Sequence, residues 1–371
     1  MSQGPTSADV YTSRIERVQR EMQLRGSDLL FVGPSSDLRY LTGFDAHLSE
    51  RLNLLVVPAT GRPMLIVPVL EAPLAQIAAP LADVYAWSET ESPTDLVGKL
   101  ASKYSPGTVA VSDQLWSGFL LKLQSAMPGV SWVSALEVIK PLRVMKDERE
   151  IELLAEVSRL TDEAWDEFIE GGPLSGLTET QAMERLATLM QKRGLGAAFG
   201  ICASGPNSAS PHHHTGNRVI QQGDAVIFDW GSTLEGYHSD VTRTVFIGQP
   251  TEKFRQVYDI VLRANQATLD AVKPGVACED LDRTARDLIT AEGYGENFIH
   301  RVGHGLGMDV HEEPYLVKGN TTPLEVGMVF SDEPGIYIEG EFGVRIEDSV
   351  VVTPHGGKRL NEATRELTIM D

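Results

Sequence analysis

The feature that most constrains the fold of this chain is a set of acidic side chains placed within apolar, strand-like segments or at their ends. Asp229 lies inside the run VIFDWG, Glu333 ends the run MVFSDE, and Glu347 lies within GVRIEDSVVVT. An ionised carboxylate in such a segment is costly to bury unless it is paired, hydrogen-bonded or bound to a metal. The fold must therefore provide each of these side chains with a compensating partner.

A predicted β-hairpin brings a fourth carboxylate to the same place. The runs AVIFDW and SDVTRTVF flank the turn-like segment GSTLEGY, which is typical of two antiparallel strands. Asp229 lies in the first strand and Asp240 begins the second. Because a hairpin returns the chain to its origin, the two carboxylates can converge.

The histidine in GHGLG completes the set. His304 lies between glycines, where the backbone can approach a site closely. Structural alternatives stay open at this point: Asp229 as a turn partner, His304 as a structural histidine, and Glu347 paired with Arg345 on the same face of a strand.

Taken together, one imidazole and four carboxylates predict a metal site. Four buried carboxylates need about four positive charges nearby, and two divalent cations supply them. Carboxylate-rich ligation favours Mn²⁺ or Co²⁺, with Zn²⁺ as an alternative. Two such ions can lower the pKa of a shared water and polarise a carbonyl group, so hydrolysis is the expected reaction class.

The length of 371 residues predicts two domains. In residues 1–140 short apolar runs alternate with helical patterns, which indicates a smaller α/β domain. The charged segment 141–150 is predicted to join it to a second domain, residues 148–371. There, amphipathic helices and strand pairs indicate an α+β fold with a mostly antiparallel sheet.

Composition excludes several classes of partner and location. The net charge of −20 disfavours nucleic acid. Cys202 and Cys278 form neither a disulfide framework nor a zinc-finger pattern, which favours a reduced, cytoplasmic location. The first ten residues lack the pattern of a secretory signal. The segment 64–82 is interrupted by a glutamate and three prolines, so no membrane association is expected.

The ordered motifs FDWG…HSDVTRT, GHGLGMDVHEEP, SDEPGIYI and GVRIEDSVVVT resemble those of the pita-bread (creatinase/aminopeptidase) metallopeptidases. Within that family the chain is most similar to the Xaa-Pro peptidases, prolidase and aminopeptidase P. The N-terminal region, with RYLTGF at 39–44, resembles the creatinase-like domain of the same enzymes. The resemblance implies a pita-bread catalytic domain preceded by a smaller creatinase-like α/β domain.

The resemblance also implies a role for each candidate ligand. Asp229 binds one metal ion and His304 binds the other, while Asp240 and Glu347 bridge the two. Glu333 is a ligand that also acts as the general base.

Three further catalytic residues follow from the same resemblance. His212 in PNSASPHHHTG and His311 in VHEEP match two family histidines that stabilise an oxyanion. His213 and His214 are alternatives to His212. Arg345 matches an arginine that supports the site, and a purely structural pair with Glu347 is the alternative.

For the substrate, the resemblance implies an Xaa-Pro dipeptide, with longer Xaa-Pro peptides as the alternative. A dipeptidase must bind a free carboxylate, for which Arg51 and His47 are candidates. A metal-free creatinase-like enzyme and a non-enzymatic scaffold are disfavoured by the retained ligand set. The family resemblance further implies a homodimer.

Overall fold

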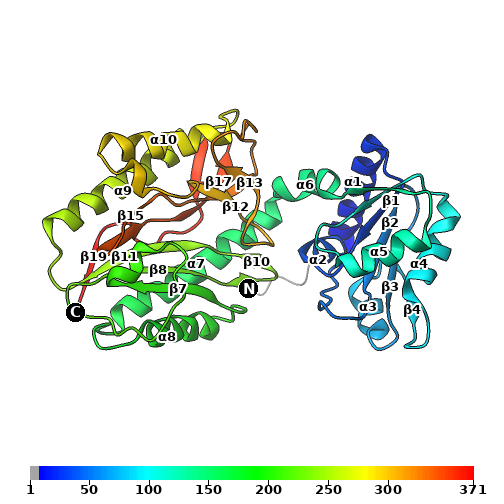
Figure 1. The fold of residues 1–371 in the computed structure, drawn as a ribbon, viewed down its shortest axis with the longest axis horizontal. Coiled ribbons are helices and arrows are strands. Elements are labelled where there is room, and N and C mark those ends of the chain that lie inside the picture. The colour runs from blue at the N-terminus through cyan, green and yellow to red at the C-terminus, as the bar shows by residue number, and fades with distance from the viewer. Residues whose placement is uncertain (1–7) are drawn as a thin grey trace. The chain divides into compact units, whose positions relative to one another are not determined.

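The computed structural model describes residues 8–371, which form two compact units (Figure 1). The division lies between Arg143 and Val144. Each unit has its own hydrophobic core and is considered by itself.

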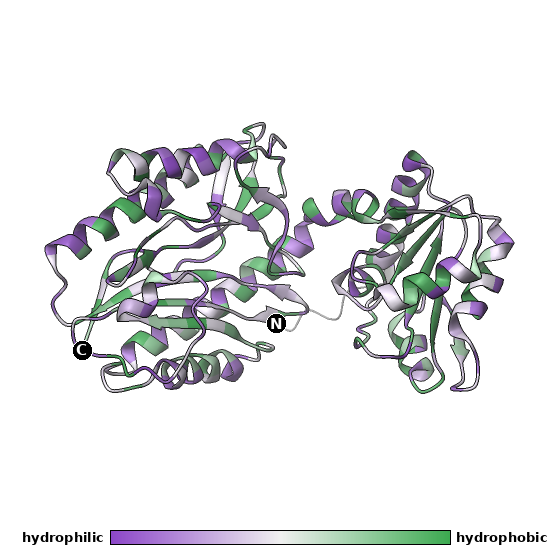
Figure 2. Ribbon diagram, in the orientation of Figure 1, coloured by the Kyte–Doolittle hydropathy of each residue, from purple (hydrophilic) through white to green (hydrophobic). Residues whose placement is uncertain are grey.

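The N-terminal unit is built around one mixed sheet in the order β4-β3-β2-β1-β5-β6. All four residues of its central strand β1 are buried, so helices must cover both faces of the sheet. The apolar strands and the mixed helix surfaces are visible in Figure 2. The strands are β1 (Leu29–Val32), β2 (Leu54–Pro58), β3 (Met64–Pro68), β4 (Asp83–Trp87), β5 (Thr108–Val111) and β6 (Ser131–Ser134). The helices are α1 (Ala8–Arg25), α2 (Ser36–Thr42), α3 (Ala72–Ala78), α4 (Pro93–Ala101), α5 (Ser117–Ala126) and, at the boundary, α6 (Leu136–Val144).

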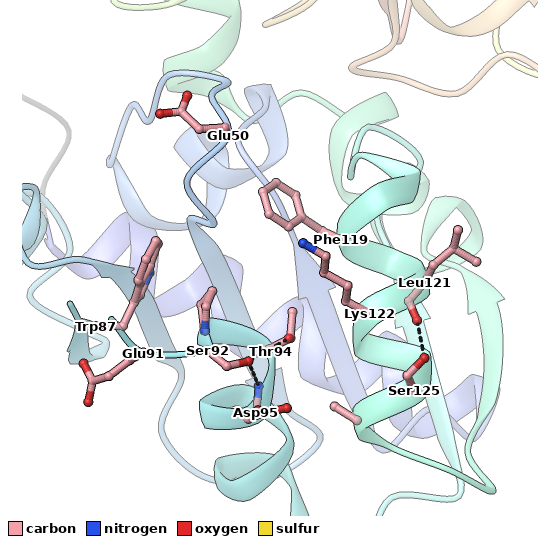
Figure 3. A pocket seen from close by; sticks show the side chains of 12 residues that line it. Glu50, Trp87, Glu91, Ser92, Thr94, Asp95, Phe119, Leu121, Lys122 and Ser125 are labelled. Carbon is pink, nitrogen blue, oxygen red and sulfur yellow. Dashed lines mark hydrogen bonds between the residues drawn. The ribbon is translucent and has the colours of Figure 1, made fainter. Parts of the chain in front are cut away.

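A hollow of about 720 Å³ lies beside α4 and α5 in this unit (Figure 3). The polar groups around it have local structural roles. Ser92 caps α4 by accepting a hydrogen bond from Asp95 N–H at 3.3 Å, and Trp87 donates to the Leu52 carbonyl at 3.0 Å. None of the predicted site residues lines this hollow.

The second unit has two larger sheets, each covered by a pair of helices (Figure 1), and two two-stranded sheets, β10-β9 and β15-β16. One sheet has the order β19-β11-β8-β7 and packs on α7 and α8, and the other has the order β13-β12-β14-β17-β18 and packs on α9 and α10. The helices are α7 (Glu148–Glu170), α8 (Glu179–Lys192), α9 (Glu252–Ala271) and α10 (Cys278–Ala291). The strands are β7 (Phe199–Ser204), β8 (Ala225–Gly231), β9 (Thr233–Leu234), β10 (Tyr237–His238), β11 (Val241–Ile247), β12 (Gly303–Gly305), β13 (Glu312–Leu316), β14 (Val329–Asp332), β15 (Gly335–Ile338), β16 (Phe342–Arg345), β17 (Asp348–Thr353), β18 (Gly356–Arg359) and β19 (Thr368–Met370).

The α+β class and the mostly antiparallel arrangement are confirmed. All strand pairs of the described unit are antiparallel except β11 with β19. The predicted hairpin is the pair β8–β11, with β9 and β10 inserted at its turn. The run GVRIEDSVVVT is two strands in different sheets, because the chain leaves β16 and enters β17 around Glu347.

Helix α7 fixes the strand that carries the first acidic residue. A capping box between Asp147 and Glu150 begins the helix, and its buried stripe includes Trp165. The indole of Trp165 stacks on Trp230 of β8 with ring centroids 4.2 Å apart. Since successive strand residues point to opposite faces, anchoring Trp230 against the helices turns Asp229 to the other face of the sheet.

The described helices include none that is both long and apolar enough to cross a membrane.

We expect Trp165→Ala to lower the free energy of unfolding of the second unit by about 3–5 kcal/mol, since it removes a fully buried indole from the helix–sheet interface. Urea denaturation followed by circular dichroism measures the change. The control is Trp116→Ala, because Trp116 is 47% exposed, and it should cost less than about 1 kcal/mol. Equal losses of unfolding free energy in the two variants would contradict the role of Trp165 in the helix–sheet interface.

Candidate metal centre

Three neighbouring strands place acidic side chains in a row. Asp229 of β8 lies opposite Thr242 of β11, and Thr242 forms a bridge with Glu347 on its other side. Asp240 lies two residues before Thr242 and therefore on the same face. The row joins the two sheets, because Glu347 directly precedes β17.

The second sheet supplies the other two predicted ligands. His304 lies in the middle of β12, and Glu333 directly follows β14. His304 Nε2 lies 3.4 Å from Glu333 Oε1 and 3.6 Å from Asp240 Oδ2. The five predicted ligands thus come together, although their positions span more than a hundred residues of the chain.

The ligand atoms fall into overlapping groups, within each of which all lie within 4.8 Å of one another. One group is Asp229, Asp240 and Glu347, and another is His304, Glu333 and Glu347. A third joins Asp240 and His304 to His311. Two groups that share a carboxylate are the arrangement expected for two ions with a bridging ligand.

The electrostatics of the cluster are unfavourable without cations. Burial, followed by the charge of Glu347, holds the pKa of Asp240 well above its usual range. Burial and the neighbouring charges of Glu333 and Asp229 do the same for Glu347. Burial raises the pKa of Glu333 to about 7 and lowers that of His304 to about 3. Each of these four pKa shifts favours the neutral form of the side chain. Bound cations would favour the ionised carboxylates, which the protein groups alone do not stabilise enough.

The atoms of the cluster fit divalent metal ions. Asp229 Oδ1 is buried and has no hydrogen-bond partner among the described residues. His304 Nδ1 lies 3.1 Å from the Gly305 carbonyl, so that nitrogen carries the proton and the Nε2 lone pair faces the carboxylates. Carboxylate oxygens with one imidazole suit the harder divalent ions.

The ion pair of Arg345 is with Asp229, at 2.8 Å. Its other guanidinium hydrogens go to Thr242 Oγ1 at 3.0 Å and to the Tyr337 hydroxyl at 3.0 Å. Thr242 Oγ1 in turn donates to Glu347 Oε2 at 2.6 Å. Arg345 therefore orients two carboxylates of the cluster, one directly and one through Thr242.

The three consecutive histidines have different environments. His212 lines the pocket that contains the acidic cluster, together with His311. His213 Nε2 lies 2.9 Å from Glu179 Oε2, and since a carboxylate only accepts, this nitrogen carries the proton. His214 is exposed. The His311 ring lies 3.9 Å from the His304 ring, centroid to centroid.

Glu179, at the start of α8, holds the loop that carries His212. Its wholly buried carboxylate accepts hydrogen bonds from the Ser204 amide and hydroxyl at 2.8 and 2.7 Å, from Asn207 at 2.9 Å and from the Gly216 amide at 3.1 Å, in addition to His213. Burial raises the pKa of Glu179, but these donors outweigh burial and lower it. The loop is thus fixed at both ends by one side chain.

Arg51 and His47 lie in the N-terminal unit. The Arg51 guanidinium is paired with Glu89 at 2.7 Å and with Glu50 at 2.6 Å. Their role in substrate binding stays a prediction.

Sequence reasoning missed Thr242, Glu179, Tyr337 and His300. His300 lines the pocket, and its Nε2 lies 2.8 Å from the Tyr337 hydroxyl. Thr242 could have been predicted from the sequence, since it lies two residues after Asp240 and therefore on the same face of the strand. No local sequence pattern indicated the role of Glu179, because its partners are 25 or more residues away.

We expect Glu179→Gln to lower the free energy of unfolding by about 1–3 kcal/mol, because an amide cannot accept on its nitrogen and leaves donors of His213 and Gly216 unpaired. Urea denaturation measures the loss. The matched control, Glu184→Gln on the exposed face of α8, should stay within about 0.5 kcal/mol of the wild type. A Glu179 variant as stable as the control would contradict this role.

Glu333 should destabilise the metal-free protein increasingly as the pH rises. Burial raises the pKa of Glu333 from 4.5 to about 7, so in this range the folded protein keeps a proton that the unfolded chain has released. The contribution of Glu333 to the free energy of unfolding of the chelated protein should therefore fall between these pH values, while the lowered pKa of His304 acts in the opposite direction. Added Mn²⁺ should raise Tm more near the upper limit than near the lower one, because ligation requires the ionised carboxylates.

Thermal denaturation across this pH range, with chelator and with Mn²⁺, checks both statements. Glu333→Gln, which does not titrate, isolates this contribution: without metal, its free energy of unfolding should rise relative to that of the wild type as the pH rises. A difference between the two proteins that stays constant over the range would contradict the raised pKa of Glu333.

Comparison with known proteins agrees with the geometry. The model of metallopeptidase family M24 matches residues 152–354, and that of the creatinase/prolidase N-terminal domain matches residues 14–145. The Xaa-Pro dipeptidase of Lactobacillus delbrueckii subsp. lactis is 35% identical over 363 residues, covering 96% of this chain and 98% of that protein.

Solved structures are similar over nearly the whole chain. The prolidase from Thermococcus sibiricus has a TM-score of 0.94 at 39% identity, covering 99% of this chain and 100% of that one. The dipeptidase PepE from Mycobacterium ulcerans has a TM-score of 0.93 at 39% identity, with the same coverage. The predicted family and pita-bread fold are confirmed: the chain belongs to metallopeptidase family M24, whose members use divalent metal ions, and it carries a creatinase/prolidase N-terminal domain.

Proposed function

We propose that this chain is a Xaa-Pro dipeptidase that works with two divalent metal ions, Mn²⁺ being the expected pair. The observation that carries the proposal is the convergence of four carboxylates, two of them buried and two half-buried, and one buried imidazole in two ligand groups that share Glu347. The similarity to proteins named prolidase and Xaa-Pro dipeptidase supports the choice of substrate.

Five side chains would hold the ions. Asp229 would hold one ion and His304 the other, with Asp240, Glu333 and Glu347 as the further ligands. When bound, the ions supply Lewis acidity and lower the pKa of a shared water molecule.

The remaining steps belong to protein groups. Glu333, which lines the pocket and whose Oε1 lies 3.4 Å from His304 Nε2, is the general base. His212 and His311 line the same pocket and would donate hydrogen bonds to the carbonyl oxygen as it gains negative charge. Arg345 acts through Asp229 and Thr242 as a positioning residue.

Steady-state hydrolysis of Ala-Pro and of Ala-Pro-Ala, each with Mn²⁺ and after chelation, tests the proposal. Metal-dependent cleavage confined to the dipeptide is expected. Efficient cleavage of the tripeptide would instead make the protein an aminopeptidase P. No metal-dependent cleavage of either peptide would refute the proposed activity.

Glu333→Gln should lower kcat for Ala-Pro by at least about a hundredfold, since it removes the base. The matched control, Glu339→Gln, changes an exposed side chain a few residues farther along and should behave as the wild type. Metal content of both variants is measured alongside, so that loss of the base is distinguished from loss of a ligand. In the N-terminal unit, Arg51→Ala should impair dipeptide hydrolysis if Arg51 and His47 contribute to substrate binding.

We also propose a cytoplasmic homodimer. The two cysteines are free and buried, as suits a reducing compartment. Leu70, Leu74 and Ile77 around α3 are 71%, 66% and 80% exposed, which supports contact with a second copy. Light scattering coupled to size-exclusion chromatography tests the dimer.

A further inference from the structure

The pocket of the candidate metal centre has a volume of about 740 Å³ and is lined by more nitrogen-bearing side chains than ligation and proton transfer require. These side chains are His212, His300, Arg301, His304, His311 and Arg345. They differ in whether they still have a positive charge and unused N–H groups to offer a substrate.

The guanidinium of Arg345 is already bonded to groups of the protein. It is only 3% exposed, and its guanidinium is committed to Asp229, Thr242 and Tyr337. A substrate could bind Arg345 only by displacing a group that orients the acidic cluster.

Two imidazoles beside the cluster, those of His300 and His311, offer a substrate no fixed positive charge. Burial lowers the pKa of His300 to about 4, and its two nitrogens lie 2.7 Å from the Arg301 carbonyl and 2.8 Å from the Tyr337 hydroxyl. Burial also lowers the pKa of His311. Neither supplies a fixed positive charge near neutral pH.

Arg301 is different. Its guanidinium carbon lies 4.3 Å from the centre of the Tyr315 ring, a stacking contact that leaves the edge N–H groups free. Within residues 8–371 no carboxylate lies within ion-pair distance of it. Its side chain is half-buried on the pocket wall.

The backbone of Arg301 is held in place beside the cluster. His300 Nδ1 donates to its carbonyl, and the next carbonyl, of Val302, accepts from the Glu333 amide at 2.8 Å. Arg301 lines the same pocket as His304, His311 and Glu333, so its side chain borders the space that a substrate would occupy.

We propose that Arg301 binds the free C-terminal carboxylate of the dipeptide and thereby restricts the site to dipeptides. This inference rests on the proposed Xaa-Pro dipeptidase function. The planar guanidinium matches a carboxylate with two parallel hydrogen bonds, and no acidic group of the described chain competes for it.

The length of the substrate explains the selectivity. In a dipeptide the carboxylate is three bonds from the scissile carbonyl carbon. In a tripeptide a neutral amide takes that position, and the carboxylate is about 3.5 Å farther away. A cation close to the metal ligands therefore favours the shorter peptide.

Hydrolysis of Ala-Pro and of Ala-Pro-amide by the full-length protein with Mn²⁺ tests the assignment, because the two substrates differ only in the carboxylate. The wild type should prefer Ala-Pro. Arg301→Gln should raise KM for Ala-Pro about ten- to a hundredfold and remove most of that preference. Arg301→Lys, which keeps the charge but loses the second hydrogen bond, should fall in between.

Two further measurements make the test specific. Proline binding, measured by calorimetry, should weaken in Arg301→Gln by a factor similar to that in KM. The control Arg283→Gln makes the same charge change at an exposed site on α10 and should leave the preference intact. The ratio of the two substrates is measured on one sample, so a partly unfolded variant still gives a valid result.

The outcomes separate this inference from the proposed function. If the wild type cleaves Ala-Pro and Arg301→Gln keeps the wild-type preference, the assignment of Arg301 is wrong while the proposed function stands. Loss of the preference in Arg51→Gln, with Arg301→Gln unaffected, would likewise overturn it and place the carboxylate anchor in the N-terminal unit. A wild type that cleaves neither substrate overturns both proposals.

Discussion

Mutual repulsion among buried carboxylates is the constraint on which the rest of the second unit depends. Asp229, Asp240, Glu333 and Glu347 meet between two sheets, where desolvation and neighbouring charge both oppose their ionisation. Arg345 compensates only part of this charge. Such a cluster lowers the stability of the fold relative to an apolar core. Divalent cations would make the ionised cluster favourable.

The surrounding layers keep the cluster in register. Stacking of Trp165 on Trp230 fixes the face that Asp229 presents, and the Thr242 hydroxyl ties Glu347 to Arg345 across the junction of the sheets. Glu179 holds the loop that carries His212, because its buried carboxylate accepts several hydrogen bonds from that loop. Each of these contacts joins a helix or strand to a group that faces the pocket. Such contacts hold the side chains of the site close together although their charges repel one another.

The same distribution of charge bears on substrate choice. Arg345 and Arg301 both line the pocket, yet Arg345 is bonded to neighbouring side chains, whereas Arg301 contacts an aromatic ring and has no carboxylate partner among residues 8–371. A positive charge without a counterion in the described part of the protein is a group that a substrate can use. The pocket thus combines an acidic cluster, which suits cations, with a basic wall, which suits the end of a short peptide.

The sequence by itself determined the kinds of element and the candidate ligands. Local patterns were enough to predict the amphipathic helices of the second unit and the β8–β11 hairpin, because burial of an apolar face depends on near neighbours. The motifs also predicted five metal ligands, whose side chains the fold brings together. Only the tertiary structure decided that Arg345 pairs with Asp229, that His213 pairs with Glu179, and that Arg301 has no acidic partner among the described residues. These outcomes depend on contacts between residues far apart in the chain, and no local pattern specifies which distant side chain will fill a given hydrogen-bonding site.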